Sequence, residues 1–171
     1  MKPIEPDLVK FFIGILFSDS KLLKKTIPFL ESKFGEIDFT SQEFGFNVSD
    51  YYKEEMCGLI FRKFISFAKL INPGDLAKNK IETNKIEDML SVDGKRKVNL
   101  DPGYIDFNKV ILASAKYNGQ KIYLDLGIYA DPTLWYEKRS FHPYPYSFPD
   151  FKTGEYNETF MQIRTLYKAK R

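Results

Sequence analysis

The sequence has almost none of the residues that build sulfur and imidazole sites. Its 171 residues include one cysteine, Cys57, and one histidine, His142. A single cysteine excludes an internal disulfide and agrees with a reducing compartment. Zinc sites made of Cys and His need at least three such ligands, so the chain cannot build one alone. A site for Mg²⁺ with oxygen ligands stays open.

Long apolar runs are also missing. The longest covers residues 11–17, FFIGILF, whereas a membrane-spanning helix needs about 20 residues. The N-terminus lacks the pattern of a signal peptide. A net charge of +3 is too small to indicate nucleic acid or an anionic membrane as partner. We therefore expect a cytoplasmic protein with no membrane partner, and a nucleic-acid partner is not favoured.

Three sequence motifs of well-known enzyme classes are absent from the chain. It contains no phosphate-binding G-x-x-x-x-G-K-[ST] loop and no dinucleotide-binding G-x-G-x-x-G turn. The nucleophile motif G-x-S-x-G is absent as well. The motifs therefore leave the question of catalysis open and name no catalytic residue.

Hydrophobic patterns typical of strands and of helices alternate along the chain, and they predict an α+β fold in one domain, residues 1–171. The pattern predicts strands over residues 9–17, 37–48, 59–70 and 97–100, and helices over residues 21–34 and 76–90. Ser18-Asp19-Ser20 can cap the first helix, Gly35 can end it, and Pro28 should kink or break it. The order βαββαβ over residues 9–105 predicts a ferredoxin-like core.

Residues 106–171 predict a C-terminal β-α extension of that core. Asp106 can cap a helix that runs to Lys116. Two strands are expected over residues 120–125 and 128–136, followed by an extended arm, HPYPYSFPDF, at residues 142–151. An amphipathic helix over residues 154–168 closes the chain.

The stretch VNLDPGYID, residues 98–106, raises the main question about function. Asp101-Pro102-Gly103-Tyr104 has the proline and glycine positions of a type II turn. The turn has two interpretations. Either Asp101, Pro102 and Gly103 serve only to form the turn, or the turn also binds a ligand. Lys95, Arg96 and Lys97 precede the turn, and the helix predicted from Asp106 would begin just after it. Basic side chains and a helix N-terminus both favour anions.

Our first hypothesis is therefore a site for an anionic small molecule or nucleotide, with or without Mg²⁺. Basic groups would hold phosphate, carboxylates a metal or hydroxyl, and aromatic rings a base; any chemistry would be phosphoryl or nucleotidyl transfer. Strand alternation places Arg62 and Lys63 on opposite faces, so both cannot face one ligand. The candidate residues are Tyr52, Glu54, Glu55, Arg62, Lys63, Arg96, Asn99, Asp101 and Tyr104.

Two other functions stay open. In the first, the chain is an interaction or regulatory module without catalysis, and residues 142–151 dock a protein partner or pack on their own sheet. In the second, the aromatic strands at residues 11–16 and 64–67 resemble those of RNA recognition motifs. The second strand lacks the basic-Gly-aromatic start of the longer RNA motif, which argues against RNA.

Several motifs together resemble one family. DYYKEEM, RKFISF, the pair Thr83-Asn84, KRKVNLDPGYI, KIYLDLGIYADPTL and YSFPDF occur in that order. This set is similar to the bacterial domain-of-unknown-function family 4416, over residues 11 to about 167. Some members carry a GTP-binding label, which the missing phosphate-binding loop does not support here.

Overall fold

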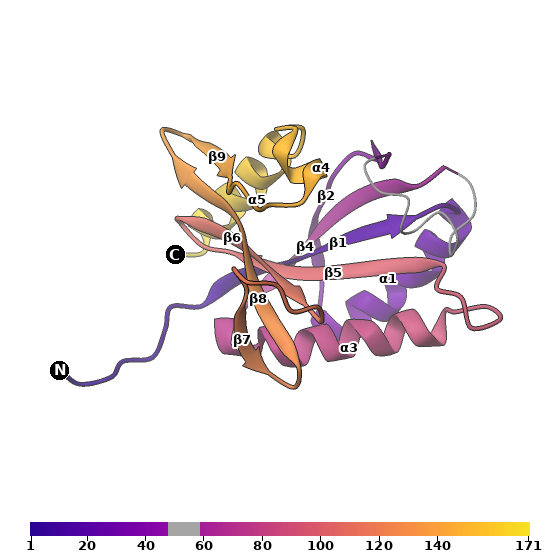
Figure 1. Cartoon of the computed structure of the whole chain (residues 1–171), viewed down its shortest axis with the longest axis horizontal. Coiled ribbons are helices and arrows are strands. Elements are labelled where there is room, and N and C mark those ends of the chain that lie inside the picture. The colour runs from indigo at the N-terminus through magenta and orange to yellow at the C-terminus, as the bar shows by residue number, and fades with distance from the viewer. Residues whose placement is uncertain (48–58) are drawn as a thin grey trace.

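A computed structural model describes residues 1–47 and 59–171 (Figure 1). Its main feature is one antiparallel sheet, with helices on both faces. The strands are β1 (Val9–Phe17), β2 (Ile37–Thr40), β3 (Phe44–Gly45), β4 (Phe61–Ile71), β5 (Val98–Ile105), β6 (Lys109–Ser114), β7 (Ile122–Asp125), β8 (Ile128–Glu137) and β9 (Ser140–Pro143). The helices are α1 (Ser20–Phe34), α3 (Leu76–Met89), α4 (Pro149–Lys152) and α5 (Asn157–Ala169), with a 3-10 turn, η2 (Pro73–Asp75), before α3.

The strands run in the order β2-β4-β1-β5-β6-β8-β7, with β3 beside β4 and β9 beside β8. All of these pairs are antiparallel. Figure 1 shows α1 and α3 on one face of the sheet and α4 and α5 on the other. The mixed α+β class predicted from the sequence is confirmed.

The two faces of β1 bury two separate apolar clusters, as strand alternation requires. On the α1 and α3 side, Phe11 and Ile13 pack with Leu30 and Ile86. On the α4 and α5 side, Phe12 packs against the edge of the Phe160 ring, with centroids 5.2 Å apart. Every residue of β1 is buried, Lys10 included, which explains the apolar run over residues 11–17.

Helix α1 begins and ends where its capping residues predict. The Asp19 side chain accepts the N–H of Lys21 at 2.8 Å, and Gly35 follows the last turn with φ +96°. Pro28 lies inside α1, and the helix continues through it. The expected single strand over residues 37–48 is instead two short strands, β2 and β3, both paired with β4.

The predicted turn at Asp101-Pro102-Gly103-Tyr104 is wrong, because these residues lie in the middle of β5. The main-chain nitrogen of Pro102 points to the same edge of β5 as that of Leu100, two residues away, where β6 has not yet joined. Proline therefore loses no ladder hydrogen bond there. Gly103 is required by close packing, since a Cβ would lie 2.5 Å from the Ile111 oxygen and 2.7 Å from the Phe12 ring.

The predicted helix from Asp106 to Lys116 is also wrong, because the segment forms a hairpin into β6. Asp106 caps a turn rather than a helix: its Oδ1 accepts the N–H groups of Asn108 and Lys109 at 2.7 and 2.9 Å. Residues 110–113 are all buried, since helices cover both faces of the sheet here. A short apolar run of this kind has no period that separates strand from helix.

The later strands and the last helix follow the sequence prediction closely. β7 and β8 form the expected pair of strands, and α5 closes the chain. Within the described part of the chain, no helix is both long and apolar enough to cross a membrane.

Candidate functional site

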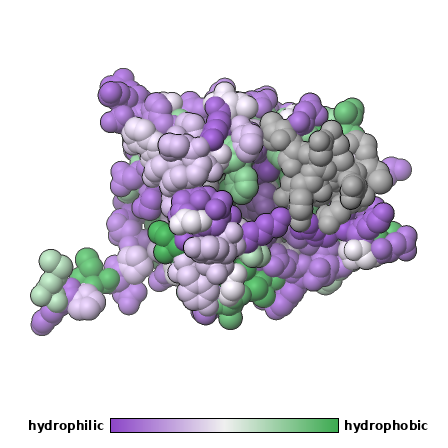
Figure 2. Space-filling model, in the orientation of Figure 1, coloured by the Kyte–Doolittle hydropathy of each residue, from purple (hydrophilic) through white to green (hydrophobic). Residues whose placement is uncertain are grey.

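A cleft opens where β5 and β6 part. The two strands pair only from Gly103 with Leu112 to Ile105 with Val110, while β6 goes on along β8 as far as Ser114. In the described residues no strand pairs with the first half of β5 on that side. The gap forms a cavity of about 690 Å³, and Figure 2 shows this face hollowed near its centre, with hydrophilic residues along the hollow.

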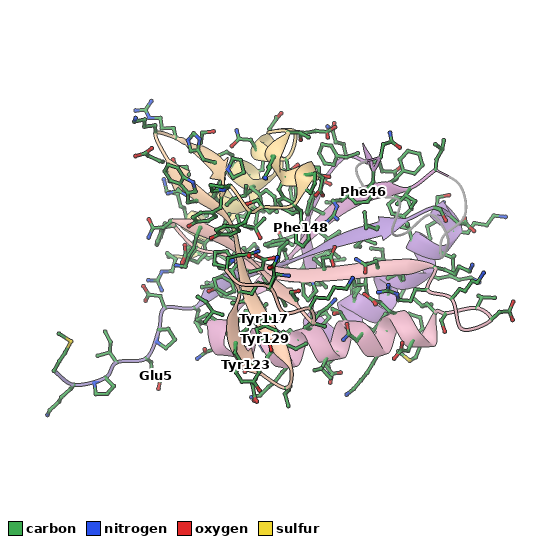
Figure 3. All side chains as sticks on the ribbon, in the orientation of Figure 1. Glu5, Phe46, Tyr117, Tyr123, Tyr129 and Phe148 are labelled. Carbon is green, nitrogen blue, oxygen red and sulfur yellow. The ribbon has the colours of Figure 1, made fainter. Side chains whose placement is uncertain are left out.

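Charged and aromatic side chains dominate the walls of the cleft. The basic lining residues that the structure describes are Arg62, Lys80, Arg96, Lys116 and Lys121. The acidic ones are Glu87, Asp88, Asp101, Asp131 and Asp150. The aromatic ones are Phe46, Phe148 and Phe151, and Figure 3 shows Phe46 and Phe148 on the α4 side of β5.

Helix α3 satisfies the open edge of β5 with two side chains. Glu87 Oε1 accepts the N–H of Leu100 at 2.6 Å, and Lys80 Nζ donates to the Leu100 oxygen at 2.7 Å. Both side chains are buried, and they lie 3.9 Å apart as an ion pair. Burial raises the pKa of Glu87, and the positive charge of Lys80 opposes that shift in part. The edge thus stays open to the cleft while both main-chain groups of Leu100 are paired.

Arg62 is one of the buried charges of the cleft, with a side chain 6% exposed. Its Nη1 lies 3.3 Å from Asp101 Oδ2 and its Nε 3.2 Å from Asp150 Oδ2. The guanidinium carbon also stands 5.1 Å from the centre of the Phe46 ring and 5.6 Å from that of Phe151. Two carboxylates and two rings therefore hold this cation in one orientation.

Asp150 belongs to the same network from the α4 side. Tyr156 donates its hydroxyl to Asp150 Oδ2 at 3.2 Å. Burial raises the pKa of Asp150, and Arg62 opposes the shift. Burial likewise raises the pKa of the Tyr156 hydroxyl. Helix α4 is therefore anchored to β4 through a buried charge network beneath the cleft.

Asn99 carries a buried side-chain nitrogen that has no hydrogen-bond partner in the described residues. Arg96 Nη1 donates to Asn99 Oδ1 at 3.3 Å and lies 3.6 Å from Glu87 Oε2. A guanidinium has no acceptor, so the amide oxygen must face Arg96 and the amide nitrogen must face away. Asn99 Nδ2 is buried and has no hydrogen-bond partner. An unsatisfied buried donor is costly, so this atom needs an explanation.

Lys121 holds the opposite wall together. Its Nζ donates to Ser114 Oγ at 2.8 Å and to the Lys116 oxygen at 3.2 Å, and it lies 3.4 Å from Asp131 Oδ2. Its ammonium also stands 5.5 Å from the centre of the Phe148 ring. Burial raises the pKa of Asp131, and Lys121 opposes that shift. These contacts use the three protons of the ammonium. Lys121 therefore links the end of β6 to β8 at this side of the cleft.

The structure brings four of the predicted site residues together: Arg62, Arg96, Asn99 and Asp101 all line the cleft. Lys63 faces the other side of the sheet, as strand alternation indicates, and lies 3.2 Å from Glu43. Tyr104 also lies outside the cleft, in an apolar cluster with Ile81, where burial raises its pKa. Tyr52, Glu54 and Glu55 lie outside the described residues.

Sequence reasoning missed the other charged residues of the cleft. Lys80, Thr83 and Glu87 share one face of α3 at helical spacing, and all three are buried. Charged residues on the buried face of a helix were the available signal, because they are rarely buried unless they have partners. Asp131, Asp150 and Lys121 carry no comparable signal in the sequence.

The arm at residues 142–151 packs on its own sheet. β9 pairs with β8, and the His142 ring packs at a tilt against Trp135 with ring centroids 5.0 Å apart. Ser147 Oγ donates to the Thr133 oxygen at 2.5 Å, and Phe151 is buried. This packing is one of the two arrangements predicted for the arm, and it places Phe148 at the cleft.

The described residues contain no group of three His, Cys, Asp or Glu side chains that could hold a metal ion. Among known proteins, the model of the family described as a domain of unknown function, DUF4416, matches residues 7–167. No curated protein and no solved structure matches the chain.

Proposed function

The chain belongs to the DUF4416 family, a domain of unknown function, and on that premise we propose that it binds an anionic small molecule, with nucleotides as the first class to test. One observation carries the proposal. Arg62, Arg96, Asn99 and Asp101, chosen from the sequence as ligand-binding residues, line one cavity of about 690 Å³. Small-molecule sites commonly have volumes of about 300–1,000 Å³.

Arg96 is the group that would meet the anion. Its side chain is 29% exposed, and its contact with Glu87 is long, at 3.6 Å. An anionic oxygen can approach this guanidinium from the cleft and form shorter charge-assisted hydrogen bonds. Arg62 is enclosed by Asp101 and Asp150, so it orients those carboxylates and is itself less accessible.

The aromatic wall supports a ligand with a planar part. Phe148 is 46% exposed at the cleft, and Phe46 and Phe151 line it from the same side of the sheet. Planar heterocycles stack on such rings with a gain of about 1–3 kcal/mol per base. A charged group at Arg96 and a ring near Phe148 together match the outline of a nucleotide. The proposal concerns binding, and phosphoryl or nucleotidyl transfer stays a prediction.

The test is a titration of purified protein with inorganic phosphate, sugar phosphates and mononucleotides, followed by thermal unfolding and calorimetry. A ligand at one hundred times its Kd adds about 2.7 kcal/mol of apparent stability. We expect Arg96→Ala to weaken binding at least about tenfold, which corresponds to one lost charge-assisted hydrogen bond.

Lys63→Ala is the matched control, because Lys63 is also basic and lies outside the cleft, on the other side of the sheet. It should bind like the wild type. Equal losses in Lys63→Ala and Arg96→Ala would indicate binding by surface charge alone. The absence of any shift with every compound would contradict the proposal.

We also infer a ferredoxin-like core within the larger sheet. The order β2-β4-β1-β5, the antiparallel pairing and the position of α1 and α3 on one face support this inference. Strands β6 to β9 would then be the extension that creates the cleft. A cytoplasmic location belongs to the same proposal, because nucleotides and sugar phosphates are metabolites of that compartment.

The alternative of a protein-interaction module is less well supported. In that alternative residues 142–151 either dock a partner or pack on their own sheet, and β9 and α4 pack this segment against β8 and the core. A protein partner therefore stays a prediction, and we carry forward the small-molecule site.

A further inference from the structure

Asn99 and Asp101 place a hydrogen-bond donor beside an acceptor on one face of β5. Residues two apart on a strand point to the same side. Both line the cleft. Asn99 presents the amide nitrogen Nδ2, which is buried and has no partner in the described chain. Asp101 presents a carboxylate, of which Oδ2 contacts Arg62 at 3.3 Å, and a carboxylate has about four acceptor positions.

The orientation of this pair is determined by its neighbours. Arg96 donates to Asn99 Oδ1, so the amide cannot turn over without placing two donors face to face. Arg62 Nη1 lies 3.3 Å from Asp101 Oδ2 and fixes the direction of this carboxylate. The pair is thus a donor followed by an acceptor, in a defined order.

A ligand that satisfies this pair needs an acceptor beside a donor. A lactam, in which a ring carbonyl adjoins a ring N–H, has that arrangement. Uracil and hypoxanthine carry a lactam edge, whereas cytosine and adenine carry an amino donor beside a ring-nitrogen acceptor at the same two ring positions. For a ring whose direction is fixed by its phosphate at Arg96, this is the reverse order. The unpartnered Asn99 Nδ2 would donate to the lactam carbonyl, and Asp101 would accept its N–H.

The charges of the cleft limit how many phosphates the ligand carries. Its described walls hold equal numbers of basic and acidic side chains, so they create no net positive field for a polyanion. Arg96 also contacts a carboxylate, that of Glu87, but at 29% exposure it is more accessible to an anionic group than Lys121 and Arg62, whose side chains are 6% exposed. This favours one phosphate over three.

We propose that the cleft selects a nucleoside monophosphate whose base has a lactam edge, such as the monophosphates of uridine or inosine. This inference rests on the proposed small-molecule function. It adds the chemical identity of the ring and the number of phosphates.

The experiment compares two pairs of ligands that differ in the hydrogen-bonding edge of the base. Uridine and cytidine monophosphates form one pair, and inosine and adenosine monophosphates form the other. Calorimetry should give a Kd at least about tenfold lower for the lactam member of each pair, because the other member leaves buried polar groups unpaired. Uridine triphosphate should bind no more tightly than the monophosphate.

Two variants at β5 test the assignment. Asn99→Ala removes the donor and should weaken uridine monophosphate at least about tenfold while changing cytidine monophosphate little. The double variant Asn99→Asp with Asp101→Asn reverses donor and acceptor at constant charge, and should reverse the preference to cytidine monophosphate. If the double variant unfolds, Asn99→Ala still decides, because it leaves the Arg62–Asp101 ion pair intact.

The outcomes separate this inference from the proposed function. Equal affinity for both members of each pair, or more than about tenfold tighter binding of the triphosphate, overturns the inference and leaves the anion site standing. Binding of sugar phosphates without binding of any nucleotide does the same. No binding of any compound overturns both.

Discussion

The Glu87 carboxylate accepts the main-chain N–H of Leu100 at 2.6 Å and thereby replaces the missing neighbour strand at the open edge of β5. Lys80 completes the exchange by donating to the Leu100 oxygen at 2.7 Å. Two side chains of α3 thus bond the main chain of β5 at Leu100, as strand β6 does from Gly103 onward. This relationship keeps the sheet divided and the cleft open.

Removing the Glu87 carboxylate should destabilise the fold. Glu87→Ala leaves the Leu100 N–H and the buried Lys80 ammonium without their acceptor, and we expect a loss of about 3 kcal/mol in the free energy of unfolding. Glu87→Gln keeps an acceptor and should lose less. Urea denaturation measures both, with Asp88→Ala, an exposed neighbour, as the control that should stay within about 0.5 kcal/mol of wild type. Equal stability of wild type and Glu87→Ala would contradict the role of this edge contact.

The stability contribution of Glu87 should depend on pH in a defined direction. Burial raises the pKa of Glu87 in the folded state above its ordinary value, although Lys80 and Arg96 oppose the shift. The folded state then binds the proton more tightly than the unfolded state. This contribution is full below the unfolded pKa, about 4.3, and is lost as the pH rises through the folded pKa.

The measurement for this pH dependence is the difference in unfolding free energy between wild type and Glu87→Gln. Glutamine does not titrate, so the difference isolates Glu87 from the other buried carboxylates. Wild type should lose stability relative to the variant as the pH rises from about 4 toward 7. A difference that grows in the opposite direction would show that the ion pairs lower the pKa.

Gly103 should tolerate no side chain. A Cβ there would lie 2.5 Å from the Ile111 oxygen and 2.7 Å from the Phe12 ring, so Gly103→Ala must displace β6 or the core. We expect a loss of about 2 kcal/mol in thermal or urea unfolding. Gly119→Ala is the control, since nothing lies within 4 Å of its Cβ position and no change is expected. Equal effects of the two substitutions would be inconsistent with the close approach at β5.

The volume of the buried Lys10 side chain should contribute more to stability than its charge. Its side chain is fully buried, pairs with Asp38 and donates to the Phe67 oxygen at 2.6 Å, and burial lowers its pKa. Lys10→Ala should lose about 3–5 kcal/mol, because it leaves a cavity and removes the partner of Asp38. Lys10→Met keeps the volume and should lose clearly less.

Asp38 explains that expected difference between the two Lys10 variants. It is 18% exposed, accepts from Ser66 at 2.8 Å and lies 3.8 Å from Lys170, so it keeps partners without Lys10. Urea denaturation of both variants beside Lys69→Ala, an exposed lysine of β4, tests the point. If the methionine variant is as unstable as the alanine variant, the charge itself holds β1 to β2.

The sequence alone determined the elements whose signals are local. The ends of α1 follow from Asp19 and Gly35, which satisfy main-chain groups through near neighbours. β1 follows from the short apolar run over residues 11–17. Strand alternation separates Arg62 from Lys63, and the basic run beside VNLDPGYID indicates an anion site around Arg96, Asn99 and Asp101.

Only the tertiary structure decided whether residues 101–104 turn or continue, and whether residues 110–113 coil or extend. Proline at position 102 fits a strand only because β6 joins one residue later, and an apolar run buried on both faces has no period of its own. The cleft was decided in the same way. Lys80 and Glu87 from α3, Lys121 before β7 and Asp150 from α4 meet only when the chain has folded, because no local rule links partners tens of residues apart.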